Sequence, residues 1–116
     1  MWQKSGHKAE VAVANLLKRR SHKIIELNWR NRFAEIDVIT NKQNVIYFVE
    51  VKYRKDTAQG DGLDYITNEK LTRMHRAAAM YMFEHQLENP MQLMVASVSG
   101  QPPRVESLIE DIQIDN

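Results

Sequence analysis

Two short apolar runs, residues 35–40 and 45–52, constrain the fold of this chain most, because acidic side chains interrupt both and a lysine ends the second. Each run has the length and β-branched content of a strand, and the polar residues 41–44 between them predict a β-hairpin. Successive side chains of a strand point to opposite faces of the sheet. Asp37 and Glu50 therefore occupy positions where a strand beside a core would normally carry apolar side chains.

A symmetric turn centred in residues 41–44 predicts the register of this hairpin. It places Glu35 opposite Glu50 and Asp37 opposite Phe48, so that Asp37 is a diagonal neighbour of Glu50 on one face. Diagonal neighbours are roughly 7 Å apart at the backbone, which lets two carboxylates bind one divalent ion. A three-residue loop would separate the two faces. The opposite face is apolar, which predicts that a helix packs against it. Its residues are Ile36, Val38, Val45, Tyr47, Val49 and Val51.

The length of 116 residues predicts a single domain covering residues 1–116. The longest apolar run, residues 77–83, is too short to span a bilayer. Residues 1–8 lack the apolar segment of a secretory signal, so we expect a cytoplasmic protein with no membrane partner. The absence of cysteine excludes disulfides and thiolate metal sites.

Charge is distributed unevenly along the chain. Residues 1–55 carry twelve Lys or Arg against five acidic residues, whereas residues 56–116 carry four against ten. The basic half contains the hairpin, which indicates that a polyanion such as DNA approaches there. Solvated helix surfaces are the alternative explanation for the clusters at residues 18–23 and 70–76. The candidate nucleic-acid-binding residues are Arg30, Arg32, Arg54, Lys55, Lys70 and Arg73.

Hydrophobic periodicity predicts the order helix, three strands, helix and two strands. Residues 53–65, rich in glycine and aspartate, predict a mobile loop that follows Lys52. This order indicates an α/β, or α+β, sandwich in which helices flank a central mixed five-stranded sheet. The predicted helices cover residues 6–20 and 67–88, and the predicted strands cover residues 23–29, 35–40, 45–52, 91–99 and 104–109.

The acidic pair and the lysine indicate a metal-dependent phosphodiesterase. Mg²⁺ or Mn²⁺ prefers oxygen ligands, and one or two carboxylates beside a phosphate are enough to bind it, so Asp37 and Glu50 are candidate ligands. Such an ion polarises a phosphoryl oxygen and lowers the pKa of a bound water. Lys52 shares the face of Glu50, where it can orient that water or neutralise charge on phosphorus. Strand charges that serve only solubility are the alternative.

Four short motifs together resemble a known family. They are G-x-x-A-E at residues 6–10, N-x-R at 28–30, E-I-D at 35–37 and F-V-E-V-K-x-R at 48–54. In order and spacing they resemble the YraN-like family of small predicted endonucleases. That family belongs to the PD-(D/E)XK nuclease superfamily and is similar to archaeal Holliday-junction resolvases. The resemblance extends over residues 6–70.

This resemblance implies a restriction-endonuclease-like fold and metal-dependent hydrolysis of DNA, with branched or otherwise structured DNA among the candidate substrates. It implies that Asp37, Glu50 and Lys52 are catalytic, and that Glu10 is a catalytic residue that supports the metal. Glu35 is a motif residue without a defined role, and we expect it to contact the metal ligands without binding the metal itself. Ala34 stands where the family usually has glycine.

Other functions fit the same residues. The chain can instead be a nucleic-acid-binding module of a DNA repair or uptake assembly, with little activity alone. Junction resolution would require two active sites and hence a homodimer. A glycoside hydrolase is disfavoured because the aromatic residues are scattered, and a zinc hydrolase because the four histidines lack ligand spacing.

Overall fold

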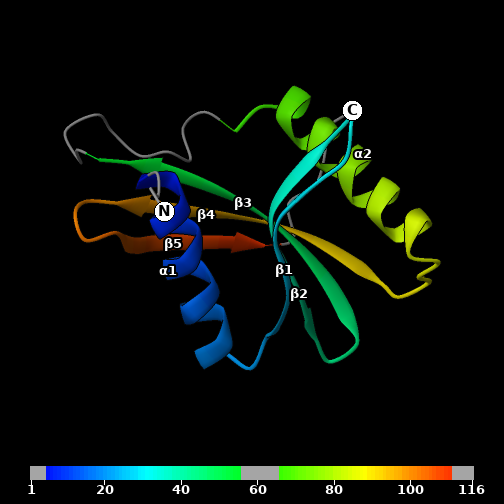
Figure 1. The fold of residues 1–116 in the computed structure, drawn as a ribbon, viewed down its shortest axis with the longest axis horizontal. Helices are drawn as coiled ribbons and strands as arrows, with labels where there is room; N and C mark the ends of the chain where they lie inside the picture. Colours follow the sequence, from blue (N-terminus) through cyan, green and yellow to red (C-terminus); the bar gives the residue numbers. More distant parts are fainter. Residues whose placement is uncertain (1–4, 56–65, 111–116) are drawn as a thin grey trace.

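The computed structural model describes residues 5–55 and 66–110, in which two helices and five strands follow the predicted order (Figure 1). The predicted α+β fold with a mixed five-stranded sheet is therefore confirmed. Most of the loop predicted after Lys52 lies outside the described residues. The helices are α1 (Ser5–Arg19) and α2 (Asn68–Glu84), and the strands are β1 (Lys23–Arg30), β2 (Glu35–Lys42), β3 (Val45–Arg54), β4 (Met91–Ser99) and β5 (Arg104–Glu110).

The sheet has the strand order β1-β2-β3-β4-β5, in which β3 and β4 are parallel and all other neighbours are antiparallel. A parallel pair needs a crossover connection, and the segment that contains α2 supplies it. The two helices cover different faces of the sheet, so each face has its own apolar cluster. The start of α2 lies near the end of the β1–β2 hairpin (Figure 1).

The two clusters bury the apolar side chains of β2 and β3 beneath both helices. Under α1, Val38 and Val49 pack among alanine, valine and leucine side chains of that helix. Under α2, Ile39 and Phe48 pack against the apolar stripe of that helix. The face that carries Asp37 also contributes to the core, because α2 covers much of it. The buried residues of α2 are Leu71, Ala77, Ala78, Tyr81 and Met82.

Hydrogen bonds cap both ends of the second helix. The Lys70 N–H donates to the Thr67 hydroxyl at 3.2 Å, which caps the amino-terminal end of α2. At the other end, Gln86 has a left-handed φ of 53°, and the Leu87 N–H donates to the Met82 carbonyl at 2.9 Å. This pattern closes a helix. The helix therefore ends four residues before the predicted residue 88.

The turn between β2 and β3 contains two residues, Gln43 and Asn44, so its centre lies one position later in the chain than the predicted centre of residues 41–44. Gln43 and Asn44 have φ angles of 51° and 70°, and left-handed backbone at both positions is typical of a type I′ turn. This turn matches the twist of the strands that it joins. Among the paired residues, Ile39 lies opposite Phe48, so the predicted pairing of Asp37 with Phe48 was wrong by two positions.

The corrected register changes the predicted relation between the acidic residues. The paired residues end with Val38 opposite Val49. Asp37 and Glu50 are the next residues along the two strands, where the prediction had a diagonal pair, and Glu35 is not the cross-strand partner of Glu50. A shift of two residues leaves every side chain on its own face of the strand, so the sharing of a face survives the error.

Strict alternation breaks down where β1 and β2 approach α2. Ile36 packs in the cluster under α2 and Val38 in the cluster under α1, although the prediction put both on one face. The facing residues of β1, Trp29 and Leu27, divide in the same way. Asn28 between them has a φ of 56°, a left-handed conformation that rotates the strand. The end of the hairpin is therefore turned relative to the rest of the sheet.

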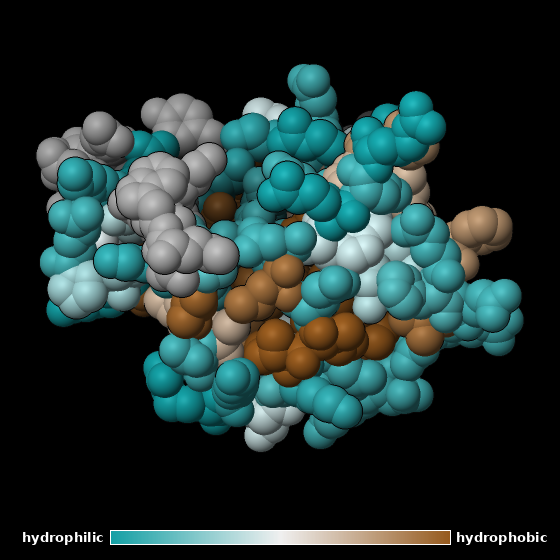
Figure 2. Space-filling view, in the orientation of Figure 1, coloured by the Kyte–Doolittle hydropathy of each residue, from teal (hydrophilic) through white to brown (hydrophobic). Residues whose placement is uncertain are grey.

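The visible surface over α2 is mainly hydrophilic, whereas apolar side chains form a band across the middle of the same view (Figure 2). Ile25 of the edge strand β1 is partly exposed.

No helix within residues 5–55 and 66–110 is long and apolar enough to cross a membrane.

Two phenylalanines provide a test of this core. Phe48 is 1% exposed and contacts Tyr81 edge-to-face, so Phe48→Ala is expected to lower the free energy of unfolding by about 3–5 kcal/mol. Phe83 is 85% exposed on α2, and Phe83→Ala is expected to change it by less than about 0.5 kcal/mol. Urea unfolding followed by circular dichroism measures both. Equal effects of the two substitutions would contradict the described packing of α2.

Candidate active site

The candidate site begins where β2 and β3 separate. Asp37 and Glu50 are the first residues beyond the last pair of this ladder, Val38 and Val49. The Val51 N–H donates to the Asp37 carboxylate oxygen Oδ2 at 2.7 Å. A side chain thus takes the place of a backbone acceptor, which fixes the Asp37 carboxylate in the opening between the strands. The two strands run in different directions beyond this point (Figure 1).

The environment of Asp37 disfavours its negative charge. Burial is the main cause that raises the pKa of Asp37 from 3.8 to about 7. The neighbouring carboxylates of Glu50, Glu10 and Glu35 raise it further, while the hydrogen bond from Val51 acts in the opposite direction. Asp37 is therefore a carboxyl group that titrates near neutral pH in the absence of a cation.

Glu10 reaches this carboxyl group from α1. Glu10 is only 9% exposed, and this burial raises the pKa of its carboxyl group. The Glu10 side chain lies within hydrogen-bonding contact of the Asp37 and Asn28 side chains. The structure thus brings together Glu10 and Asp37, which are far apart in the sequence, and the catalytic role of Glu10 stays a prediction.

Two lysines meet on the other side of Glu50. The Lys52 ammonium lies 3.1 Å from the Glu50 carboxylate oxygen Oε1, and both side chains are about one-quarter exposed. Lys70, in the first turn of α2, lies close to Lys52, and this neighbouring positive charge lowers the pKa of Lys70. The positive ammonium groups of Lys52 and Lys70 outnumber the single carboxylate of Glu50. This excess of positive charge favours an anion beside them.

The predicted metal ligands do not form a three-residue metal site by themselves. In residues 5–55 and 66–110, no group of three or more His, Asp or Glu side chains is placed to hold a metal ion. Glu50 is paired with Lys52, and Asp37 accepts the Val51 N–H, so both carboxylates are directed toward protein partners. Asp37 and Glu50 still match the donor set that Mg²⁺ needs, because this ion keeps several waters and binds phosphate oxygens.

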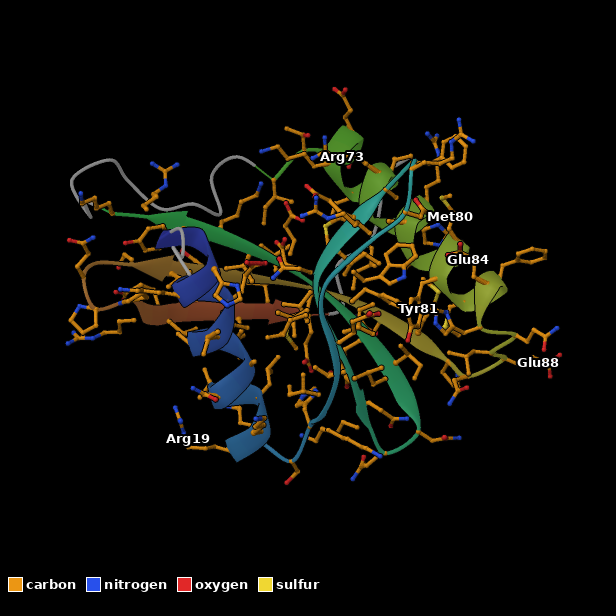
Figure 3. The ribbon with its side chains drawn as sticks, in the orientation of Figure 1. Arg19, Arg73, Met80, Tyr81, Glu84 and Glu88 are labelled. Atoms are coloured by element: carbon orange, nitrogen blue, oxygen red, sulfur yellow. The ribbon has the colours of Figure 1, made fainter. Side chains whose placement is uncertain are left out.

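A pocket of about 440 Å³ adjoins Glu50 between α2 and the end of the β1–β2 hairpin. Of the predicted nucleic-acid-binding residues, Arg30 and Arg73 line it. Arg73 lies near the amino-terminal end of α2, and Arg19 lies at the far end of α1 (Figure 3). Arg54 ends β3, where its carbonyl accepts the Gly100 N–H, so Arg54 and Lys55 lie apart from this pocket.

A larger pocket, about 630 Å³, lies elsewhere. It is formed between α1 and the turn that joins β4 and β5, and none of the predicted site residues lines it. Its size therefore does not identify it as the candidate site, because Glu10, Asp37 and Lys70, whose pKa values are perturbed, gather around the opening between β2 and β3.

The family of this chain follows from comparison with known proteins. A family model described as uncharacterised protein family UPF0102 matches residues 9–105. This chain belongs to the UPF0102 family. UPF0102 is the YraN-like group, so the resemblance found in the sequence is confirmed. The description of the family names no activity.

Relatives of this UPF0102 protein occur in distant bacteria. A UPF0102 protein of Fusobacterium nucleatum is 35% identical over 77 residues, which cover 66% of this chain and 65% of that protein. One of Methylococcus capsulatus is 35% identical over 95 residues, covering 82% and 77% of the two chains. One of Myxococcus xanthus is 32% identical over 100 residues, covering 85% and 79%. The match thus spans slightly less than two thirds of the Fusobacterium protein.

Sequence reasoning missed several neighbours of the site in this UPF0102 chain. Asn28 contacts Glu10, and Lys70 contacts Lys52, although Lys70 was predicted only as a DNA-binding residue. Glu35 lies beside Glu50 as a lining residue of the pocket, not as its cross-strand partner. The residues with positive φ include Asn28 but not Ala34, so alanine fits the position where the family usually has glycine.

The titration of Asp37 gives a prediction for stability. Below pH 3.8 its carboxyl group is protonated in the folded and the unfolded chain, so Asp37→Asn should have little effect there. As the pH rises to about 7, the wild type loses stability relative to the variant. The reason is that the Asp37 carboxyl ionises near pH 3.8 in the unfolded chain but only near pH 7 in the folded protein. The two pKa values differ by about three, so the variant should gain up to about 4 kcal/mol at pH 8.

Urea unfolding in EDTA between pH 4 and pH 8 measures this difference. Glu88→Gln removes an exposed carboxylate from the segment after α2 and should leave the stability difference nearly constant with pH. A gain for Asp37→Asn that is as large at pH 4 as at pH 8 would contradict the raised pKa of Asp37.

Proposed function

We propose that this UPF0102 protein is a divalent-metal-dependent endonuclease that hydrolyses phosphodiester bonds of DNA. The observation that carries the proposal is the meeting of Asp37, Glu50 and Lys52 at the opening between β2 and β3. Burial and neighbouring carboxylates raise the pKa of Asp37 to about 7, which marks a group of acids that a cation would stabilise.

Asp37 and Glu50 would hold Mg²⁺ or Mn²⁺ in this proposal, and Glu10 would support Asp37. When bound, the ion would supply polarisation of a phosphoryl oxygen and a lowered pKa of water. Glu50 would then have to release Lys52 in part, since the two side chains are now paired at 3.1 Å. The hydrogen bond from the Val51 N–H fixes the position of the Asp37 oxygen Oδ2.

Lys52 and Lys70 would bind the phosphate that is cleaved. Their ammonium groups are adjacent, so an anionic oxygen between them relieves their repulsion. Negative charge on the phosphoryl oxygens grows during hydrolysis, and fixed cations beside those oxygens stabilise it. Arg30 and Arg73 line the adjoining pocket, and they would bind neighbouring phosphates of the same strand.

A nuclease assay tests the proposal directly. Purified wild-type protein is expected to cut single-stranded, flap or four-way-junction DNA with Mg²⁺ or Mn²⁺ and to stop in EDTA. Asp37→Ala and Lys52→Ala should each lower the rate at least about 100-fold, because each removes a group that acts on the reacting phosphate. Arg19→Ala, which removes a positive charge at the far end of α1, should keep the rate within about twofold.

The outcome also separates this activity from a binding module. If the wild type cuts none of these substrates with Mn²⁺, or if Asp37→Ala cuts as fast as the wild type, the nuclease proposal fails. Salt-dependent DNA binding that survives Asp37→Ala and Glu50→Ala, without cleavage under either metal, would favour a module that works within a larger DNA repair or uptake assembly.

The contact between the two lysines gives a second prediction for the same assay. Lys70→Ala is expected to lower the cleavage rate about tenfold, and Lys70→Arg, which keeps the positive charge, should recover most of it. The circular dichroism spectrum should stay unchanged, since Lys70 contributes its backbone N–H, not its side chain, to the helix cap. A wild-type rate for Lys70→Ala would exclude Lys70 from the phosphate site.

A further inference from the structure

Phe33 is an aromatic side chain that the fold holds in solvent. It is 74% exposed, in the turn at residues 31–34 between β1 and β2. The Asn31 side-chain oxygen accepts the N–H groups of Phe33 and Ala34, each at 2.8 Å, and the Asn31 N–H donates to the Ala34 carbonyl at 2.9 Å. These three hydrogen bonds define the turn, so the exposure of Phe33 is a property of a structured segment.

Phe33 lines the same 440 Å³ pocket as Glu50. The pocket also has an apolar wall from α2, formed by Met74 and Ala77, and its charged residues include Arg73. Pockets that bind small molecules commonly measure about 300–1,000 Å³ and combine apolar walls with a few polar groups. The pocket therefore suits a flat, partly polar group that reaches it from the side of the candidate site.

The Arg32 guanidinium lies over the Phe33 ring, 5.2 Å from its centre. An aromatic ring beside an arginine is a surface on which unpaired bases of nucleic acids stack, because every base offers a flat π-face. The positive charges of Arg32 and Arg73 also suit the phosphates on either side of such a base. A protein partner would explain an exposed phenylalanine, but it would not explain the arginines that surround this one.

We propose that this pocket receives one unpaired base of the DNA strand, stacked on Phe33, next to the phosphate at Asp37, Glu50 and Lys52. The inference rests on the proposed nuclease function and names its substrate class, which is DNA with an unpaired nucleotide beside the cleaved bond. A base within a regular duplex is stacked and paired, so it reaches the pocket only after the cost of leaving the helix. The phosphate at the metal ligands and the base at Phe33 are recognised together.

Binding in EDTA tests the base site without cleavage. Fluorescence anisotropy would compare three labelled duplexes: one fully paired, one with a single bulged thymidine, and one with an abasic residue in the same bulge. The abasic bulge keeps the flexible backbone and removes only the base. Wild-type protein is expected to bind the thymidine bulge about tenfold more tightly than the abasic bulge.

Substitutions then assign this preference to the ring. Phe33→Ala should bind both bulges equally, and Phe33→Trp, which keeps a stacking surface, should retain the preference. Phe83→Ala is the matched control, since it removes an equally exposed phenylalanine that does not line the pocket. It should retain the wild-type preference.

Equal binding of the two bulges by the wild type, or a preference that survives Phe33→Ala, would overturn the base site. The result is independent of turnover. If the preference is present and depends on Phe33 but no DNA is cut with Mn²⁺, the nuclease proposal fails while the base site stands. If DNA is cut and the two bulges bind equally, the base site fails alone.

Discussion

The candidate site depends on the hydrogen bond from the Val51 N–H to the Asp37 carboxylate. A sheet that continued its ladder at this position would pair backbone groups and leave no room for side chains between β2 and β3. Here a carboxylate accepts the N–H at 2.7 Å, so the strands separate without leaving this donor unsatisfied. The same bond fixes a negative group in a buried place, where burial and other carboxylates oppose its charge.

The site therefore contains two kinds of electrostatic conflict side by side. Asp37 lies near Glu10 and Glu50, and Lys52 lies near Lys70. Glu50 and Lys52 join opposite charges at 3.1 Å. A divalent cation among the acids and a phosphate between the lysines would remove both conflicts together, because each supplies the missing sign. Sites that are destabilised without their ligands in this way are common where a protein binds or reacts.

The order of elements could be predicted from the sequence because it follows from local periodicity, which each strand and helix carries by itself. The register could not, because residues 41–44 are all polar and any of them can form the turn. Gln43 adopts a left-handed conformation that its residue type does not signal. The end of α2 was missed for the same reason, since Gln86 closes the helix before Asn89 and Pro90 can do so. The contacts of Lys70 depend on tertiary packing, which no local pattern reports.

The left-handed backbone of Asn28 connects the acids of the candidate site with the pocket. Asparagine adopts this conformation at lower cost than most residues, and here it turns the hairpin so that Trp29 and Ile36 pack under α2. Without that rotation, alternation would place Ile36 under α1 with Val38, and residues 31–34 would not lie beside α2. The same side chain contacts Glu10, so one residue both turns the hairpin and contacts the acidic group. The backbone of β1 thus contributes to the position of Phe33 relative to Asp37, and the proposed base and phosphate sites would then be recognised as one unit.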